Sequence, residues 1–420
     1  MRPSRVRSRR QTQPVAEAQP AMRKHRPAYL LPVLALTLLA MGLVVIFTIG
    51  PGLSVQRNVS DNYFVGKQFM AMILGFAAFL VVGRLPLSVW SRAVPYLLGL
   101  AAAGALAVLV FGSNINGATR WISIGGFSFQ AAELIKFAYL IWLAKFLSNP
   151  DTLMVKNEAR SLKIIIGSLG LIGLVVAGLQ SDLGSAAVMV FMAAGILFVS
   201  GIRLQKLLMI GGIVIAGVLL LIVITPYRRD RLSTFMNPER DCLGSGYQAC
   251  QALVAVGSGG VAGKGMERSV QAYGYLPFAE NDSIFAIYAE KFGFIGTTFF
   301  IFLYGLLLAT LLRIARKAPD QFSRLIVIGV TMWFGGQAFI NIGAMVGILP
   351  LKGITLPLVS YGGTSLIFVL AALGLVFQIS RYTRRYSAVS SEASDRGYAT
   401  APRAGGFSIS RPGGRSGGLS

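Results

Sequence analysis

The sequence predicts an all-α polytopic membrane protein with about ten transmembrane helices, one long extracytoplasmic loop and both termini in the cytoplasm. The first observation behind this prediction is the composition: 54% of the 420 residues are hydrophobic and only 13% are charged, whereas soluble proteins carry about 25% charged residues. The second is that the apolar residues gather into long runs. The third is the position of the basic residues between those runs.

Ten apolar runs are long enough, or nearly so, to cross a hydrocarbon layer of ~30 Å. They lie near residues 29–50, 67–84, 93–111, 132–148, 163–179, 184–201, 206–225, 284–314, 322–346 and 363–382. The first run is too long for a signal peptide and lacks a small-residue cleavage site, so we expect a retained anchor. The eighth is longer than one span needs, so part of it should project or tilt.

The net charge of +23 comes from 39 Lys and Arg against 16 Asp and Glu. Such an excess often indicates nucleic-acid binding, but much of it lies in two tails and in short loops. There it sets membrane orientation. With the N-terminus inside, the outside loops near 51–66, 112–131 and 347–362 are nearly free of Lys and Arg. The pattern argues against nucleic acid as a partner.

Three parts follow from this pattern. Residues 1–28 form a basic tail and residues 386–420 a tail rich in Ser, Gly and Arg. Both are expected to be disordered and cytoplasmic. A membrane domain spans 29–385, and its loop of about 226–283 falls outside. A structureless loop of that length is uncommon unless it has a function.

A carboxylate at the outer membrane boundary is the first candidate for chemistry. Asp282 lies in AENDSIFAIYAEKFGFIG (279–296) and directly precedes the eighth run. An N-cap is the commoner role for such an Asp, and a general base at the edge of a cavity is the other. The two roles are compatible. Glu290, about eight residues or ~12 Å along the helix, is too deep for the same site and should pair within the bundle.

Polar residues recur every three positions at the start of the fourth run. Gln130, Glu133 and Lys136 should therefore share one helix face, where Glu133 and Lys136 can pair. Intramembrane ionisable residues usually face a bundle interior or an aqueous cavity. A structural ion pair between helices is an equally good interpretation. Trp121, just upstream, is a candidate for the interfacial aromatic belt.

The long loop carries basic residues that could clamp a phosphate or pyrophosphate. They are Arg228, Arg229, Arg231, Arg240, Lys264 and Arg268. Its glycines would let backbone N–H groups approach an anion; they are Gly257, Gly259, Gly260, Gly263 and Gly265. Taken alone, a flexible loop with solvated charge is the better interpretation, because the GKG sequence lacks the strand–loop–helix context of a P-loop.

A further candidate is LPLKGITLPLVSYGGTS, residues 349–365. Pro350 and Pro357 should break helical structure, and Gly362 and Gly363 permit close backbone approach. Irregular backbone at this depth is tolerated where it lines a cavity or is buried in protein. Either a site or helix packing explains it.

Cys242 and Cys250, both in the long loop, are the two cysteines of the chain. They could form a disulfide in an oxidising compartment, and the sequence leaves the bridged and the free forms open. The spacing of ligands that a zinc site needs is missing, and His25 is the single histidine.

The chain resembles the SEDS family of shape, elongation, division and sporulation proteins, typified by FtsW, RodA and SpoVE. Six ordered motifs, which span a resemblance from about residue 29 to 385, carry it. They are NGATRWISIGGFSFQAAELIKF (116–137), QSDLGSA (180–186), PYRRDRLSTFMNP (226–238), GYQACQALVAVGSGGVAGKG (246–265), YLPFAENDSIFA (275–286) and NIGAMVGILPLKGITLPLVSYGGTS (341–365). Lys352 and Thr355 resemble the division branch of the family.

The resemblance implies a peptidoglycan glycosyltransferase. Such enzymes polymerise lipid II, an undecaprenyl-pyrophosphate-linked disaccharide-pentapeptide, at the outer face of the bacterial cytoplasmic membrane. It also implies, as partners, a class B penicillin-binding protein (an FtsI-like transpeptidase) and other divisome proteins at the septum. Three alternatives stay open: a lipid II flippase, an elongation-type polymerase and a structural scaffold.

The resemblance also suggests roles for individual residues. Asp282 matches a kept aspartate and becomes the candidate general base. Cationic side chains, or a divalent cation such as magnesium or manganese with ligands unknown, would neutralise the departing pyrophosphate. The cationic candidates are Arg228, Arg231, Lys264 and Lys352. The residues expected to shape the cavity are Trp121, Gln130, Glu133, Lys136, Asp182, Gln248, Ser360, Tyr361, Gly362 and Gly363.

The sequence departs from the family pattern at four motif positions. Phe278 stands where the family usually has Glu, Ser283 where it has Phe, Ser181 where it has Pro and Ala132 where it has Ser. Whether Glu280, two residues after Phe278, substitutes for the missing acid stays open.

Overall fold

The computed structural model describes residues 22–24, 26–115, 118–124, 127–153, 158–236 and 241–384. The described residues belong to one unit, Met22–Arg384. The disorder expected for the tails at 1–28 and 386–420 falls almost wholly outside the described residues.

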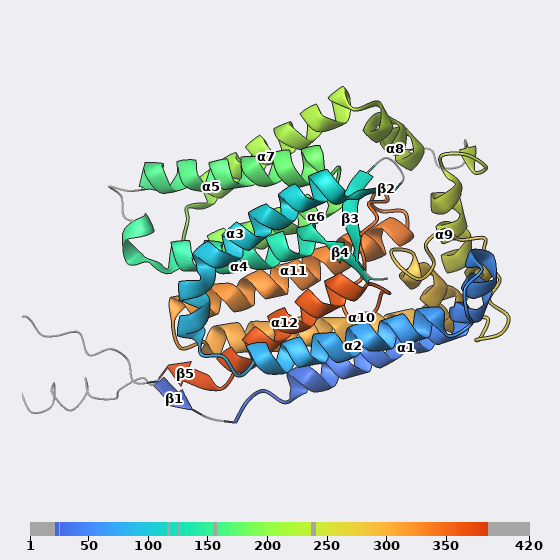
Figure 1. Ribbon diagram of the computed structural model, residues 1–420, viewed down its shortest axis with the longest axis horizontal. Helices are drawn as coiled ribbons and strands as arrows, with labels where there is room; N and C mark the ends of the chain where they lie inside the picture. Colours follow the sequence, from blue (N-terminus) through green and yellow to red (C-terminus); the bar gives the residue numbers. More distant parts are fainter. Residues whose placement is uncertain are drawn as a thin grey trace, which may run out of the picture. The chain divides into compact units, whose positions relative to one another are not determined.

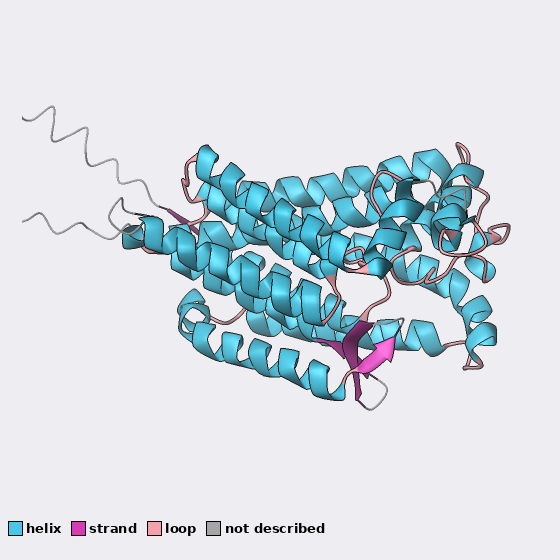
Figure 2. Ribbon diagram, turned by 90° about the horizontal axis from the view of Figure 1, so that it is seen from above, coloured by secondary structure: helices cyan, strands magenta, loops and turns pink. Residues whose placement is uncertain are grey.

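Each of the ten predicted runs is a helical segment of the described structure (Figure 1, Figure 2). The segments are α1 (Leu30–Arg57), α2 (Tyr63–Val82), α3 (Leu87–Phe111), α4 (Ala131–Ser148), α5 (Glu158–Ile172) with its π-helical continuation η2 (Gly173–Leu179), α6 (Leu183–Val199), α7 (Leu204–Ile224), α10 (Ile284–Lys317), α11 (Gln321–Met345) and α12 (Gly363–Ile379). Seven of them are long and apolar enough to cross a membrane, α6 and α12 are shorter apolar helices, and α4 carries Glu133, Lys136 and Lys145. The predicted fold class is confirmed.

Helix α11 lies at the centre of the bundle. It packs against α4, α6 and α10, and 72% of its most apolar 18-residue stretch is buried inside the protein. By contrast, only 6% of the most apolar 18-residue stretch of α7 is buried. Helix α7 therefore presents an apolar surface nearly all round, as expected of a segment surrounded by lipid. Polar side chains on α11 are the ones best placed to shape an internal site.

The connections between helices contain structure that the hydrophobic pattern did not reveal. The external loop expected over 226–283 folds into α8 (Pro226–Met236), α9 (Tyr247–Ser258) and the 3-10 turn η4 (Gln271–Tyr273), and a second turn, η1, spans Pro150–Leu153. Three short strands form an antiparallel sheet in the order β2 (Ser113–Ile115), β3 (Ala118–Ile124), β4 (Phe127–Gln130). This sheet is the main departure from the all-helical expectation.

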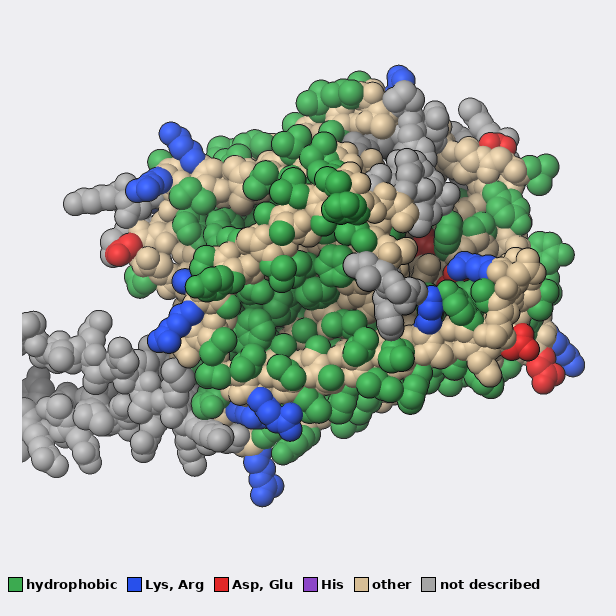
Figure 3. All heavy atoms as spheres, viewed as in Figure 1, with side chains coloured by type: hydrophobic (Ala, Val, Ile, Leu, Met, Phe, Trp, Pro, Cys, Tyr) green, Lys and Arg blue, Asp and Glu red, His purple; other side chains and the backbone are tan. Residues whose placement is uncertain are grey.

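Contacts between connections agree with the predicted orientation. Glu158 pairs with Lys206, which joins two loops expected inside, and Arg57 pairs with Glu280, which joins two expected outside. Strand β1 (Met22–Lys24) pairs antiparallel with β5 (Tyr382–Arg384), so the two ends of the described chain lie together. Figure 3 shows apolar side chains over the middle of one face and most charged side chains toward its two ends.

Helix α10 is broken near its start. Gly293 has φ 63° and ψ −163°, far from helical values, and the glycine-rich stretch after α9 packs against the break. The amides of Lys264 and Gly265 donate to the carbonyls of Glu290 and Lys291 at 2.9 and 3.0 Å, and the amide of Phe294 donates to the carbonyl of Gly260 at 2.9 Å. The expectation that glycine amides of this loop approach an anion is wrong at Gly265, because its amide is bound to a carbonyl of α10.

Close packing of this stretch predicts the effect of adding one methyl group. A Cβ on Gly259 would lie 2.2 Å from the carbonyl oxygen of Ala289, whereas a Cβ on Gly257, in the last turn of α9, meets nothing within 4 Å. We expect Gly259→Ala to lower the free energy of unfolding by about 1–3 kcal/mol. Gly257→Ala, the matched control, should leave it unchanged or raise it. Thermal unfolding in detergent measures both, and equal midpoints would contradict the packing described.

Candidate active site

Asp282 lies in the turn that leads into α10 and is buried, with 8% of its surface exposed. Its Oδ2 accepts a hydrogen bond from Nε2 of Gln248 on α9 at 3.3 Å, and its carbonyl oxygen accepts one from Nδ2 of Asn341 at 2.7 Å. The N-cap of α10 is Ser283, and no side chain caps this helix. The N-cap role expected for Asp282 is therefore wrong, and the carboxylate faces α9.

The surroundings of Asp282 raise its pKa to about 6, chiefly because burial penalises the charged form, and the charge of Glu280 adds to the increase. The hydrogen bonds from Gln248 and from the backbone of Asp282 itself, together with the charge of Arg231, act in the opposite direction. A carboxyl group that titrates near neutral pH can both take up and release a proton. That property suits a general base.

The raised pKa predicts how activity depends on pH. A general base works in its ionised form, and a pKa of about 6 means that Asp282 becomes protonated as the pH falls through 6. We expect the turnover rate to be high and nearly constant above pH 7 and to fall about tenfold per pH unit well below 6. A rate profile from pH 4.5 to 8 measures this, and a rate independent of pH down to 4.5 would contradict it.

Arg120 borders the same glycine as Asp282 and was not among the predicted candidates. A methyl group on Gly353 would lie 3.8 Å from Oδ2 of Asp282 and 4.0 Å from Nη1 of Arg120, so both side chains border this glycine. Nε and Nη2 of Arg120 donate to the carbonyls of Gln180 and Ser181 at 3.3 and 2.6 Å. Its signal in the sequence was a basic residue in a short outside loop otherwise nearly free of them.

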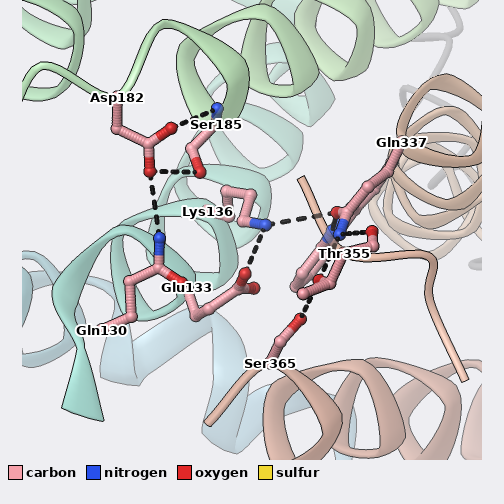
Figure 4. Close-up of polar contacts among 9 residues, drawn as sticks. Gln130, Glu133, Lys136, Asp182, Ser185, Gln337, Thr355 and Ser365 are labelled. Carbon is pink, nitrogen blue, oxygen red and sulfur yellow. Dashed lines mark hydrogen bonds and ion pairs between the residues drawn. The ribbon is translucent and has the colours of Figure 1, made fainter. Parts of the chain in front are cut away.

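A buried polar chain connects α4 to the segment beside Asp282 (Figure 4). Nζ of Lys136 lies 2.8 Å from Oε1 of Glu133 and donates to Oε1 of Gln337 at 3.2 Å. Nε2 of Gln337 donates to the carbonyl of Thr355 at 2.8 Å. Glu133 and Lys136 are 2% and 1% exposed. The pair therefore joins α4 to α11 and supports the loop before α12.

Gln337 and Asn341 hold that loop from one face of α11. They lie four residues apart, hence about one turn apart on the helix. Nδ2 of Asn341 donates to the carbonyl of Ile354 at 2.7 Å as well as to that of Asp282, while Gln337 binds Thr355. These residues were missed, although two amides at helical spacing in an apolar run are a recognisable signal.

Gln130 does not share the helix face of Glu133, contrary to expectation, because it ends strand β4 rather than lying in α4. Its Nε2 donates to Oδ2 of Asp182 at 3.0 Å (Figure 4). Asp182 is the N-cap of α6 and accepts from the amide and hydroxyl of Ser185 at 3.0 and 2.8 Å. The pair Gln130–Asp182 thus ties the sheet to the start of α6.

Two of the residues that depart from the family pattern have a left-handed backbone conformation. Ser181 has φ 53° and Phe278 has φ 52°. A proline at 181, whose ring fixes φ near −65°, could not take the conformation seen here. Each residue lies within four positions of an acid of this region, Asp182 or Asp282. Backbone strain of this kind gathers at functional sites.

The basic candidates divide between two places. Arg231 on α8 donates from Nη1 to the carbonyl of Leu351 at 3.3 Å, and half-buried Lys352 follows in the chain. Lys264 instead pairs with Glu290 at 3.3 Å. The side chains of Arg228 and Arg240 lie outside the described residues. Arg231 and Lys352 are therefore the predicted cations found near the Asp282 segment.

Glu290 anchors the external loop, contrary to the expectation that it pairs within the bundle. Its carboxylate is fully buried. It accepts from the hydroxyl of Ser269 at 2.6 Å and the amide of Val270 at 3.0 Å, in addition to the ion pair with Lys264. Its role is structural.

The YGG segment contacts Asp282's own loop. The amide of Tyr361 donates to the carbonyl of Glu280 at 2.9 Å, and Oγ of Ser360 accepts from the amide of Leu356 at 2.7 Å. The close backbone approach expected at Gly362 and Gly363 is absent from these two described residues, because a Cβ would meet nothing nearer than 3.7 Å at Gly362 and nothing within 4 Å at Gly363.

Glu280 lies in the loop that the YGG segment contacts. It is completely buried and forms an ion pair with Arg57 at the end of α1. The guanidinium of Arg57 also lies over the ring of Phe64, 5.2 Å from its centroid. Glu280 therefore links α1 to the turn that carries Asp282.

Trp121 is half-buried on β3, where it pairs with Gln130 of β4. It therefore belongs to the sheet that also carries Arg120. An interfacial belt position is compatible with its partial exposure.

A cavity of about 210 Å³ opens beside Gln248. It lies between α8, α9 and the end of α11, and its polar lining includes Arg231, Thr234, Ser245 and Gln248. Gln248 therefore connects this cavity to Asp282, whose carboxylate accepts its hydrogen bond. In Figure 3, acidic atoms are recessed beside basic side chains at the α9 end of the molecule.

The described residues contain no metal site built from three or more protein ligands. No group of three His, Cys, Asp or Glu side chains gathers among them in a way that could hold a metal ion. The cations near Asp282 are side chains of Arg and Lys. We therefore derive no step through a bound metal.

The sequence pattern of the FtsW/RodA/SpoVE family of cell cycle proteins matches residues 28–385. The chain belongs to this family. This chain is 37% identical over 354 residues to the "Probable peptidoglycan glycosyltransferase FtsW" of Thioalkalivibrio sulfidiphilus. The alignment covers 83% of this chain and 88% of that one. It is 34% identical over 366 residues to stage V sporulation protein E of Bacillus subtilis, covering 86% and 99%.

Several solved chains resemble this protein, and two of them serve as examples. One is a chain of a peptidoglycan synthase complex that coordinates polymerisation and crosslinking, with TM-score 0.70 and 31% identity over 84% of this chain and 98% of that one. The other is the rod shape determining protein RodA of Thermus thermophilus, with TM-score 0.62 and 28% identity over 86% and 98%. The similarity spans the membrane domain.

Proposed function

We propose that this FtsW/RodA/SpoVE protein is a peptidoglycan glycosyltransferase that polymerises lipid II at the outer face of the cytoplasmic membrane. The observation that carries the proposal is the buried Asp282 carboxylate, which shares the neighbourhood of Gly353 with Arg120 and accepts a hydrogen bond from Gln248 of a cavity wall. It lies at the end of the bundle that the charge pattern places outside. The relatives named as peptidoglycan glycosyltransferases support the same activity.

The residues around Asp282 suit glycosyl transfer. The 4-hydroxyl of one lipid-linked sugar attacks the anomeric carbon of another, and Asp282 takes the proton of that hydroxyl. A new glycosidic C–O bond forms while the bond to pyrophosphate breaks, and the lipid pyrophosphate leaves with the electron pair. Arg120, Arg231 and Lys352 supply positive charge for the departing phosphates. Both lipid substrates enter sideways from the bilayer.

The finer assignment is a septal enzyme that works with a class B penicillin-binding protein. Support comes from relatives named FtsW, from the division-type Lys352 and Thr355, and from the similarity to a chain of a synthase complex that couples polymerisation to crosslinking. A fluorescent fusion should gather at the septum. A distribution along the side wall would favour the elongation-type alternative.

The flippase alternative predicts different chemistry from the same protein. A transporter needs polar residues spread through the depth of the bilayer, whereas Glu133 and Lys136, the intramembrane charges of α4, bind each other and Gln337. The test is reconstitution in vesicles with a class B penicillin-binding protein and purified lipid II. We expect glycan strands on a gel. Transfer of labelled lipid II between leaflets without strands would favour the flippase.

A further inference from the structure

A disulfide lies at the start of the helix that contacts Asp282. Cys242 and Cys250 are bonded to each other, eight residues apart, with their Cα atoms 5.7 Å apart. Just before this loop, the carboxylate of Asp241 accepts from the amide of Ser245 at 2.7 Å, and its carbonyl accepts from the amide of Gly246 at 3.0 Å. The entry to α9 is therefore fixed by one covalent bond and several hydrogen bonds.

Gln248 lies in the first turn of α9, between the two bonded cysteines. Its Nε2 donates to Oδ2 of Asp282 at 3.3 Å and to Oγ of Ser283 at 3.1 Å. The hydroxyl of Ser283 in turn donates to the carbonyl of Pro277 at 2.9 Å. One amide group thus holds both the carboxylate and the turn that presents it.

The rest of α9 is anchored farther along. Ala252 and Ala255 are buried in the core, and the glycine stretch after α9 pairs with the break in α10. These contacts hold the middle and the end of the helix. The disulfide holds its beginning, which is the part that carries Gln248.

We propose that Gln248 and the Cys242–Cys250 disulfide form a positioning unit for the Asp282 carboxylate, so that full activity requires the two cysteines to be oxidised. This inference rests on the proposed role of Asp282 in polymerisation. Formation of the bond removes two electrons and two protons from the thiols, and a disulfide-exchange oxidant outside the membrane accepts them. Gln248 and the cysteines contact no substrate atom in this account and act through Asp282.

The test reduces the disulfide in the folded, reconstituted protein with dithiothreitol, which is itself oxidised to a cyclic disulfide. We expect kcat for lipid II polymerisation to fall about tenfold, since a misplaced catalytic group loses much of its effect, while KM stays within about twofold. The amide of Gln248 favours the charged carboxylate. Its displacement should therefore move the acid limb of the rate profile upward by about one pH unit.

Other charges face Asp282 and remain in place during this test. They are Glu280 in the same turn, Arg231 on α8 and Arg120 on β3. None of them lies within the disulfide loop. A shift of the acid limb on reduction therefore reports the position of Gln248.

Two variants make the test decisive. Cys242→Ser/Cys250→Ser should show the reduced rate without dithiothreitol and no further response to it, which also controls for effects on the partner protein. Gln248→Ala should lose a similar factor in kcat, and reduction should add nothing, because both changes remove the same interaction. Elution as a single species from gel filtration shows that each variant is folded.

Unchanged kcat and an unchanged pH profile in the reduced wild-type protein would overturn the proposal. The proposal would also be overturned if reduction lowered the kcat of Gln248→Ala by a further factor, so that the two losses in kcat multiply. These outcomes differ from failure of the proposed function, in which the oxidised wild-type protein itself makes no glycan strands.

Discussion

Replacing Asp282 by Asn is expected to lower the rate of lipid II polymerisation by about a thousandfold, within the range that a positioned general base contributes. The amide has nearly the shape of the carboxylate but cannot take a proton from a sugar hydroxyl. The Asn341 bond goes to the carbonyl oxygen of residue 282 and does not depend on its side chain. The turn into α10 should therefore keep its fold. Strand formation from purified lipid II measures the loss.

The matched control is Glu267→Gln in the same external region. Glu267 is an exposed acid, so its neutralisation changes the net charge by the same amount without touching the buried site. Its rate should stay within about twofold of wild type, as for most surface changes. A comparable loss in both variants would point to net charge rather than to a base at 282.

Removing Lys136 alone is expected to destabilise the bundle strongly. Lys136→Met leaves Glu133 buried at 2% exposure without its partner at 2.8 Å. Breaking one side of a buried pair costs about 3–5 kcal/mol, because an uncompensated charge remains. The amide of Gln337 also loses a donor at 3.2 Å. Thermal unfolding in detergent should show a much lower midpoint.

The double variant Glu133→Gln/Lys136→Met distinguishes a charge effect from loss of packing. It removes both charges and keeps side chains of similar size, and such replacements of buried pairs are often neutral or stabilising. We expect it to recover most of the stability that Lys136→Met loses. If the double variant is as unstable as the single one, the ion pair is not the reason for the loss.

The membrane fold followed from local properties of the sequence. Runs such as 322–346 are apolar over a bilayer's thickness, and backbone groups in lipid must bond within their own segment, so helices were the expected outcome. Asp282 was identifiable because it directly precedes an apolar run at the predicted outer boundary and matches an aspartate of the family motif. The pairing of Glu133 with Lys136 followed from their spacing of three residues.

The errors came from contacts between distant segments. Gln130 was assigned to a helix because its spacing to Glu133 fits one, yet hydrogen bonds across β2, β3 and β4 give it extended backbone. Asn341 lies 59 residues from Asp282 in the chain, and no local pattern connects them. The capping role of Asp282 failed because α9 offers its carboxylate a side-chain donor instead.

The glycine-rich stretch after α9 also makes contacts with a distant segment that a local pattern does not reveal. For GSGGVAGKG, a flexible loop was the better interpretation from the sequence, and an anion-binding loop was the alternative because glycines expose amide groups. The structure places carbonyls of the broken α10 against the amides of Lys264 and Gly265, a consequence of Gly293 that the sequence alone does not reveal. Conversely, Arg120 was overlooked although it lay within a quoted motif.

The most direct test of the central claim measures binding and turnover of lipid II on the same reconstituted Asp282→Asn preparation, with its partner transpeptidase present. If Asp282 is the base, labelled lipid II should bind with an affinity within about twofold of wild type, because Arg120, Arg231 and Lys352 are unchanged. Glycan strands should form about a thousandfold more slowly than with the wild-type protein. Strands formed at the wild-type rate by this variant would contradict the assignment of the catalytic base.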